Sequence, residues 1–476
     1  MKKFLVLLTF FHSVFTHAGL NQLAREFLER NSIVAEAKSN IILAQLDIES
    51  WSASRTTTIN WISDYNNNSL ESYSAFAAQF AGGAFRQPIE IQTHGLTLSK
   101  EFNWGGSLSF ENTFNAIEAQ GTQKIYGFTQ GLTFKQNIGR DLFGRNFKIE
   151  GEALESTLKA STFKSQNDID QSLLNLINNY YSASLYKSLV DLQNEALKRA
   201  QRRLDLIKKR VRDGLRERVD MIQARISLLK ARESVKSARQ NLISNLESLS
   251  TAVHRNVDNS DIIGLTEKRF KAHQVVQGEV KDNLNLKTLE FQVEALGKSL
   301  KSRENNLLPE INFQASLKNN NYDPGMGEGI RGGTFGKPND EVAVGVNLTW
   351  PIGGKPQKVE ETRARVQYET AKLKKERLAI DIVQIEKSLV DQVKVLEENL
   401  KSSNLRIKLA DNALEEYTKL YERGRADLDQ LIAAEETLIQ TQINHIQYQS
   451  QREQLSYQLS FIYGDLAKEL GAGEKK

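Results

Sequence analysis

The chain has 476 residues and a formal net charge of +4 at neutral pH, which argues against a general binder of polyanions. Cysteine is absent, so the sequence excludes disulfide bonds, thiolate metal sites and a lipid-bearing N-terminal cysteine. Charged residues make up 26% and hydrophobic residues 39% of the chain, a balance that predicts a folded protein.

The first 18 residues have the pattern of a secretory signal peptide. Lys2 and Lys3 precede an apolar run from Phe4 to Phe11, and the small residue Ala18 stands before Gly19. The run is too short to span a bilayer. We therefore expect residues 1–18 to be removed and the mature chain to be exported; the alternative is a buried N-terminal helix.

The first half of the mature chain begins with a predicted helix over residues 20–50, followed by a strand region over residues 55–138. Alternation in the strand region is clearest where Tyr126, Phe128, Leu132 and Phe134 share one side. Such a period of two predicts strands with two unlike faces.

A long helical hairpin over residues 152–256 completes the first half. Between Gly151 and Gly214, and again between Gly214 and Gly264, the sequence holds neither glycine nor proline. Apolar residues recur there at steps of three and four, which is typical of coiled-coil helices. We expect the tip of the hairpin at Gly214.

The second half repeats this order, which makes the chain an internal duplication of residues 19–264 and 265–476. It predicts a helix over residues 279–306, a strand pair over residues 308–350 and a hairpin over residues 357–468 with its tip at Gly424. Each strand of the pair alternates over about ten residues, the length of a tilted membrane strand. On periodicity alone, a soluble hairpin domain with one face on a core fits equally well.

At this point the chain resembles the TolC-like outer-membrane efflux proteins. The duplicated order of elements carries the match, together with the strand exit Leu348-Thr349-Trp350-Pro351-Ile352-Gly353-Gly354. The tips add a third feature: Arg210-Val211-Arg212-Asp213-Gly214-Leu215 and Tyr421-Glu422-Arg423-Gly424-Arg425 are similar to the turn motif of the family, and each is followed by an aspartate on the next helix.

The resemblance implies a mainly α fold with a membrane β-barrel. A homotrimer would share one twelve-stranded barrel, four strands from each chain, and a long periplasmic tunnel of helices. It implies a passive exit duct in outer-membrane lipid, working with a periplasmic adaptor and an inner-membrane pump or ABC transporter, in efflux or type I secretion. The segment before Ile89 is longer than this pattern requires, which leaves the strand number of the first half open.

The resemblance also assigns roles at the tips. Gly214, Leu215, Gly424 and Arg425 would contact the adaptor. Asp220 and Tyr421 stand where the family has a pair that closes the tunnel. The arginine that accompanies this pair is replaced by Ala426, and the acidic rings of the family correspond to Gln430 and Ala433, for which Asp427 and Asp429 would substitute.

The two tips also differ in charge. The first carries a basic run that includes Arg199, Arg202, Arg203, Lys208, Lys209, Arg210, Arg212, Arg216 and Arg218, whereas the second carries Asp427, Asp429, Glu435 and Glu436. Opposite charges on neighbouring tips would help to hold the tunnel closed. The alternative is two solvated helix faces without a partner.

The main rival function is a periplasmic coiled-coil adaptor or scaffold without a membrane barrel. An enzyme is not predicted, because no catalytic, metal or cofactor constellation is present, and His254 and His273 stand alone. We expect no cofactor and no nucleic-acid partner. The sequence does not indicate the exported substrate.

Overall fold

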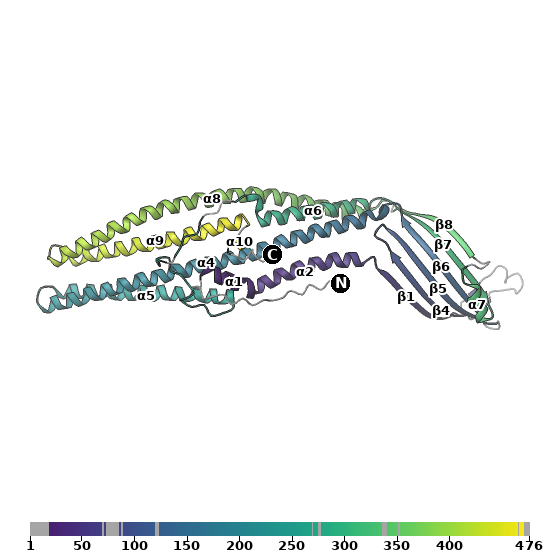
Figure 1. The fold of residues 1–476 in the computed structure, drawn as a ribbon, viewed down its shortest axis with the longest axis horizontal. Helices are drawn as coiled ribbons and strands as arrows, with labels where there is room; N and C mark the ends of the chain where they lie inside the picture. The colour runs from purple at the N-terminus through teal and green to yellow at the C-terminus, as the bar shows by residue number, and fades with distance from the viewer. Residues whose placement is uncertain are drawn as a thin grey trace. The chain divides into compact units, whose positions relative to one another are not determined.

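The computed structural model describes ten stretches of the chain (Figure 1), namely residues 19–68, 71–72, 85–86, 89–119, 123–268, 270–274, 278–335, 340–350, 353–464 and 466–470. The proposed signal peptide, residues 1–18, lies outside them, as do Pro351 and Ile352 of the strand-exit motif. The chain forms two compact units.

The first unit, here called the helical unit, comprises Met1–Ile41, Thr162–Thr288 and Glu376–Lys476. The second, the sheet unit, comprises Ile42–Ser161 and Leu289–Lys375. Each unit therefore takes segments from both halves of the sequence duplication.

The described helices are dominated by four long ones that form two hairpins, α4 with α5 and α8 with α9. The helices are α1 (Leu20–Arg30), α2 (Ser32–Ala53), α4 (Arg145–Arg212), α5 (Arg218–Val253), α6 (Leu284–Asn305), α7 (Met326–Gly332), α8 (Lys355–Glu422), α9 (Leu428–Ile462) and α10 (Leu466–Glu469), with short 3-10 turns η1 (Leu142–Gly144) and η2 (Val280–Asp282).

Helix α4 contains one glycine, Gly151, and packing explains it. A Cβ atom at this position would lie 2.4 Å from the ring of Trp51 on α2, closer than atoms can approach. Glycine therefore allows α2 to pack tightly on α4 at this point of the sheet unit, which offsets its low helix propensity.

Apolar stripes of the long helices form the core of the helical unit. Leu23 and Phe27 of α1 are buried with Leu173 and Ile177 of α4 and with Leu249 of α5. A second cluster lies near the hairpin tips and joins both hairpins through Leu204, Ile207, Ala224, Leu228, Tyr421 and Leu431. A third joins α8 to α9. Burial of these stripes, more than helix propensity, stabilises helices of this length.

The sheet unit holds one antiparallel sheet of six strands in the order β1-β4-β5-β6-β7-β8 (Figure 1). The strands are β1 (Thr57–Asn68), β4 (Ile89–Glu101), β5 (Gly106–Ala119), β6 (Ile125–Asn137), β7 (Glu310–Asp323) and β8 (Asp340–Thr349). A short pair, β2 (Glu71–Ser72) and β3 (Phe85–Arg86), forms a second sheet.

The strand number corrects the expectation of four strands from each chain. The first half supplies four strands to the large sheet and the second half two, because the long segment before Ile89 forms β1 and pairs with β4 over its whole length. The duplication is therefore unequal in its strands. The seven-residue helix α7 packs on β6 and β7.

Among the described residues, no helix combines the length and the apolar character that a bilayer crossing requires.

Candidate functional site

The strand register separates the sheet into an apolar face and a polar face. Leu132 of β6, for example, lies opposite Phe110 of β5 and Leu317 of β7, so the three side chains share a face. The apolar face collects Ile59, Trp61, Tyr65, Leu96, Leu98, Leu108, Phe110, Phe114, Phe128, Leu132, Phe134, Ile311, Phe313, Leu317, Val342, Val344, Val346 and Leu348.

The opposite face is mostly polar, with Ile62, Ile91, Ile117 and Ile125 as apolar exceptions. It presents Asn60, Asp64, Thr93, Thr97, Ser99, Ser109, Glu111, Thr113, Thr129, Thr133, Lys135, Asn312, Gln314, Ser316, Lys318 and Asn347. Two contacts tie its strands together: Ser99 donates to Ser109 over 3.1 Å, and Lys318 lies 4.0 Å from Glu111.

Much of the apolar face is exposed, including Trp61, Leu96, Leu98, Val342 and Val344. A continuous apolar patch of this size is unfavourable in water and fits contact with lipid. The large-sheet strands are 10 to 14 residues long, enough for a tilted strand to cross a bilayer. One apolar and one polar face is the pattern of a sheet with lipid on one side and water on the other.

The apolar face also carries polar residues. At the end where the helices join, Lys100 donates to the carbonyl oxygen of Arg55 over 2.9 Å. Midway along the strands, Gln130 donates to Asn112 over 3.1 Å and accepts a hydrogen bond from the backbone of Phe335, just after α7. The segment around α7 therefore covers part of this face.

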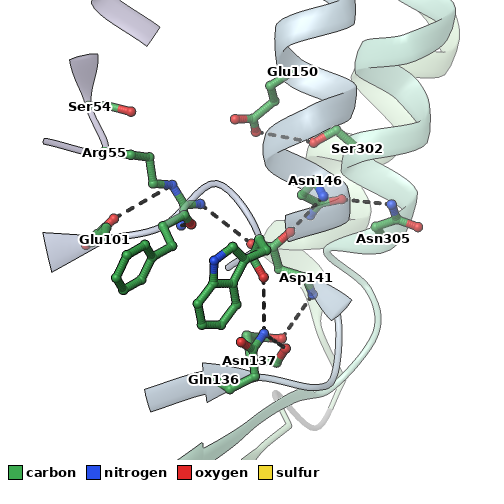
Figure 2. A network of polar contacts seen from close by, with 12 residues as sticks. Ser54, Arg55, Glu101, Gln136, Asn137, Asp141, Asn146, Glu150, Ser302 and Asn305 are labelled. Atoms are coloured by element: carbon green, nitrogen blue, oxygen red, sulfur yellow. Dashed lines mark hydrogen bonds and ion pairs between the residues drawn. The ribbon is translucent and has the colours of Figure 1, made fainter. Parts of the chain in front are cut away.

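The helix-bearing end of the sheet is fixed by a polar network centred on Arg55 (Figure 2). The Arg55 guanidinium lies 3.8 Å from Glu101 and 3.7 Å from Asp141, and it donates to the carbonyl oxygen of Phe102. Its central carbon lies 4.4 Å above the ring of Phe147, which itself stacks on Trp51. One side chain therefore joins the start of β1, the end of β4 and the start of α4.

Asparagines extend the network to α6 (Figure 2). The Asp141 carboxylate accepts from the backbone N–H of Asn146 over 2.7 Å, and Asn305 donates to the side chain of Asn146 over 2.8 Å. Asn137 accepts two backbone hydrogen bonds, from Gly139 and Asp141. These contacts fix the turn between β6 and α4.

Both hairpin tips end the incoming helix in the same way. The N–H of Leu215 donates to Arg210 over 2.8 Å, and the N–H of Arg425 donates to Leu420 over 2.9 Å. Gly214 and Gly424 have φ values of 73° and 72°. This is the Schellman arrangement, in which glycine takes the left-handed position at the helix end.

The residues proposed to contact the adaptor are open to solvent, unlike the buried core residues near them. Leu215 is 71% exposed, and Arg425 is exposed as well. A Cβ atom added at Gly214 or at Gly424 would meet no atom within 4 Å. Glycine is required at the tips for its backbone angle, and the space around them is open.

Tyr421, one of the proposed gate residues, is buried instead of facing the partner that the resemblance implies. The side chain is 1% exposed, and its hydroxyl finds no hydrogen-bond partner among the described residues. The ring lies beneath Arg216 and Arg210, whose guanidinium carbons are 4.8 Å and 5.4 Å from its centre. The described residues thus include no hydrogen bond between Tyr421 and Asp220.

The remaining proposed gate positions have local structural explanations. Ala426, where the family has an arginine, is buried in the same cluster as Tyr421, so this position contributes packing here. Asp427 is the N-cap of α9, and its backbone N–H donates to Gln430 over 3.1 Å. Asp429 lies in the first turn of α9, where a negative charge interacts favourably with the helix dipole.

A buried ion pair joins the two hairpins near the tips, and the sequence alone did not single it out. Glu435 of α9 accepts from Arg199 of α4 over 2.9 Å and also pairs with Arg203, and both Glu435 and Arg203 are buried. Arg203 further donates to Ser227 of α5 over 2.6 Å. The opposite charges of the two tips were visible in the sequence; which of them become buried together was not.

A second buried polar group lies away from the tips, around His273. Glu453 accepts the backbone N–H of His273 over 2.7 Å, and the His273 ring stacks on Tyr457 with ring centres 4.0 Å apart. Burial lowers the pKa of His273, and the positive charge of Arg452 lowers it further. Burial raises the pKa of Glu453, which hydrogen bonds from His273 and Arg452 partly oppose. This cluster attaches residues 271–273 to α9.

Within the described stretches, no group of three histidine or acidic side chains is arranged to hold a metal ion. The features that remain are a sheet with one lipid-compatible face and a pair of long helical hairpins. Together they define the class of membrane-embedded strand proteins with coiled-coil helical hairpins.

Comparison with known proteins identifies the family. The profile described as outer membrane efflux protein matches residues 130–253 and 275–465, well over half of the chain, so the protein belongs to this family. Its members are exit ducts of the outer membrane; the sheet of this protein lies in that membrane and its helical part in the periplasm. The matched residues begin within β6, so β1, β4 and β5 lie outside the match.

Solved structures of outer-membrane channels share the fold. The outer membrane protein VceC of Vibrio cholerae is 16% identical, with a TM-score of 0.69 over 96% of this chain and 97% of its own. The MtrE channel of Neisseria gonorrhoeae, solved in its open state, is 16% identical with a TM-score of 0.66, over 96% and 89% of the two chains. The CmeC channel of Campylobacter jejuni is 13% identical with a TM-score of 0.66, over 96% and 87%. A comparison with functionally curated proteins found no match.

Proposed function

We propose that the protein acts as a homotrimeric, passive duct that receives its cargo from a periplasmic adaptor and an inner-membrane pump. The observation that carries this proposal is the two-faced sheet, whose apolar face fits lipid and whose polar face fits a water-filled interior. A single chain leaves both sheet edges unpaired, which lipid does not tolerate. Several copies must therefore share the membrane part.

The hairpin tips are the proposed contact with the adaptor. Leu215 is an exposed apolar residue at the end of a rigid turn, and Arg425 holds the equivalent position on the second hairpin. Exposure of an apolar side chain to water is unfavourable, and a partner that covers it removes this cost. Gly214 and Gly424 fix the two turns and contribute no side chain to the contact.

The gate is proposed to close between neighbouring chains. Asp220 lies at the start of α5, half-buried near the tip, and no hydrogen bond or ion pair engages it within the described residues. Asp429 is exposed in the corresponding turn of α9. Both are free to pair with basic residues of the next copy, whereas Tyr421 and Asp427 act inside their own chain.

Single-channel conductance of the full-length mature protein in planar bilayers tests this proposal. We expect small closed-state currents from the protein itself and larger currents from Asp220→Lys, which replaces an attractive charge at the gate with a repulsive one. Asp168→Lys, on the exposed surface of α4 far from the tip, is the matched control and should leave the current unchanged.

Two results would count against the proposal. If the detergent-extracted protein conducts no current at all, the duct function is refuted. If the Asp220→Lys variant and the unmodified protein carry equal currents, the gate role of Asp220 is refuted.

A further inference from the structure

The edges of the large sheet form the interaction surface of interest. Among the described strands, β1 pairs only with β4 and β8 only with β7, so each has one side without a partner strand (Figure 1). Side chains of the apolar face are most exposed on these two strands: Trp61 is 75% exposed and Val342 is 73%, against 36% for Leu132 inside the sheet. An edge strand has a neighbouring strand on one side only, which accounts for the greater exposure of its side chains.

Both edges lack proline and lysine, two features that proteins use to prevent edge-to-edge pairing. The sequences of β1 and β8 are TTINWISDYNNN and DEVAVGVNLT, and their charged residues are the acidic Asp64, Asp340 and Glu341. Both strands are long and regularly paired on their inner side, without a register break. Exposed edges of this kind are ready to pair with another strand.

The two edges also fit each other. All neighbours in the sheet are antiparallel and the sheet has six strands, so β1 and β8 run in opposite directions. β8 of one copy can therefore pair antiparallel with β1 of the next, as a closed antiparallel barrel requires. Ile59 and Trp61 on β1 then continue the apolar face of Val342 and Val344 on β8.

We propose that β1 and β8 form the junction between copies, so that three chains close an eighteen-stranded barrel in place of a twelve-stranded one. The proposal rests on the proposed trimer, with each chain supplying all six strands. With strands about 4.8 Å apart and tilted by about 40°, the backbone diameter is about 36 Å, compared with about 24 Å for twelve strands. The exit of this duct is correspondingly wide.

Disulfide trapping in outer membranes tests the junction, and the absence of native cysteine makes it unambiguous. Val344→Cys on β8 is combined in turn with Ile59→Cys, Trp61→Cys and Ser63→Cys on β1, all on the same face. Only paired strands bring Cα atoms within about 7 Å, the reach of a disulfide. The control combines Val344→Cys with Phe110→Cys on β5, an inner strand of the same face.

We expect at least one β8–β1 combination to give covalent dimers and trimers on non-reducing gels, with none from the β8–β5 control. Cross-linking of β8 to β5 would overturn the proposal, because β5 would then be the edge of a smaller barrel. A β8–β1 ladder that stops at the dimer would refute the three-copy ring and the proposed trimer while leaving the edge pairing in place.

Electron cryomicroscopy of the unmodified particle provides a second test that does not depend on variants folding. A cross-section of eighteen strands supports the proposal. Twelve strands in a three-copy particle would overturn it and leave the proposed duct function intact.

Discussion

The ion pair between Arg203 and Glu435 gives the sharpest prediction about the helical unit. Both side chains are buried, and together with Arg199 and Ser227 they connect α4, α5 and α9. Replacing Glu435 with glutamine keeps the shape of the side chain and removes its charge. The guanidinium of Arg203 is then left buried without its counter-ion.

An uncompensated buried charge of this kind costs about 3–5 kcal/mol. We therefore expect Glu435→Gln to lower the free energy of local opening around the hairpin tips by about that amount. Amide hydrogen exchange of the detergent-solubilised particle measures it, because exchange reports the stability of each segment separately. The loss should appear in α4, α5 and α9 near the tips and be absent from the strands.

The neighbouring residue provides a matched control. Glu436 pairs with Lys230 over 2.8 Å between the same two hairpins, but both side chains are exposed. Exposed pairs contribute at most about 1 kcal/mol, so Glu436→Gln should change exchange only slightly. Equal effects of Glu435→Gln and Glu436→Gln would refute the reasoning, since burial would then have no influence.

Three further predictions concern the tips and the half-buried His273. Leu215→Asp should abolish co-purification with the adaptor at unchanged thermal stability, whereas Thr251→Asp, on exposed α5 surface, should preserve binding. Gly214→Ala should destabilise its tip by about 1 kcal/mol in hydrogen exchange, because alanine strains at φ 73°, while Gly327→Ala, at an unstrained open position, should not. Because the pKa of His273 is lowered, its neutral form favours folding, and residues 270–274 should exchange faster as pH falls below about 6.5; His273→Gln should remove this dependence, after correction for intrinsic exchange.

Each of these has a contrary outcome. If the Leu215→Asp variant still binds the adaptor, the contact does not depend on Leu215. Equal destabilisation by the two alanine substitutions would show that the tip is not strained. Faster exchange at low pH that persists unchanged in His273→Gln would exclude His273 as its cause. Glu453 does not account for such a result, because its raised pKa predicts slower exchange as pH falls.

Much of the fold could be predicted because its patterns are local. The long helices can be predicted because their sequences are almost free of glycine and proline and their apolar residues recur every three or four positions. The structures of related channels confirm the fold class. The glycine tips follow from backbone geometry, since a left-handed residue at a helix end favours glycine.

The strand number could not be predicted in the same way. β1 is rich in asparagine, threonine and serine, and only Ile59, Trp61 and Tyr65 mark its apolar side. An edge strand has few neighbours on its own face, so its sequence is weakly constrained, and its identity depends on pairing with β4. The resemblance to the family suggested four strands in the place of six.

The contacts at the tips were only partly visible. The sequence showed a basic and an acidic tip, but the pairing of Arg203 with Glu435 joins residues far apart in the chain. The resemblance also predicted a gate role for Tyr421, which stays a prediction, but not that its ring packs beneath two arginines of its own chain. Contacts of this kind depend on how the hairpins pack, which no local pattern specifies.

The particle mass after detergent extraction tests the central claim most directly. Outer membranes are washed with carbonate, extracted with detergent, and analysed by light scattering corrected for bound detergent. We expect a carbonate-resistant particle of three times the mass of the mature chain. A monomer or dimer released by carbonate alone would contradict the membrane duct and favour a soluble periplasmic scaffold.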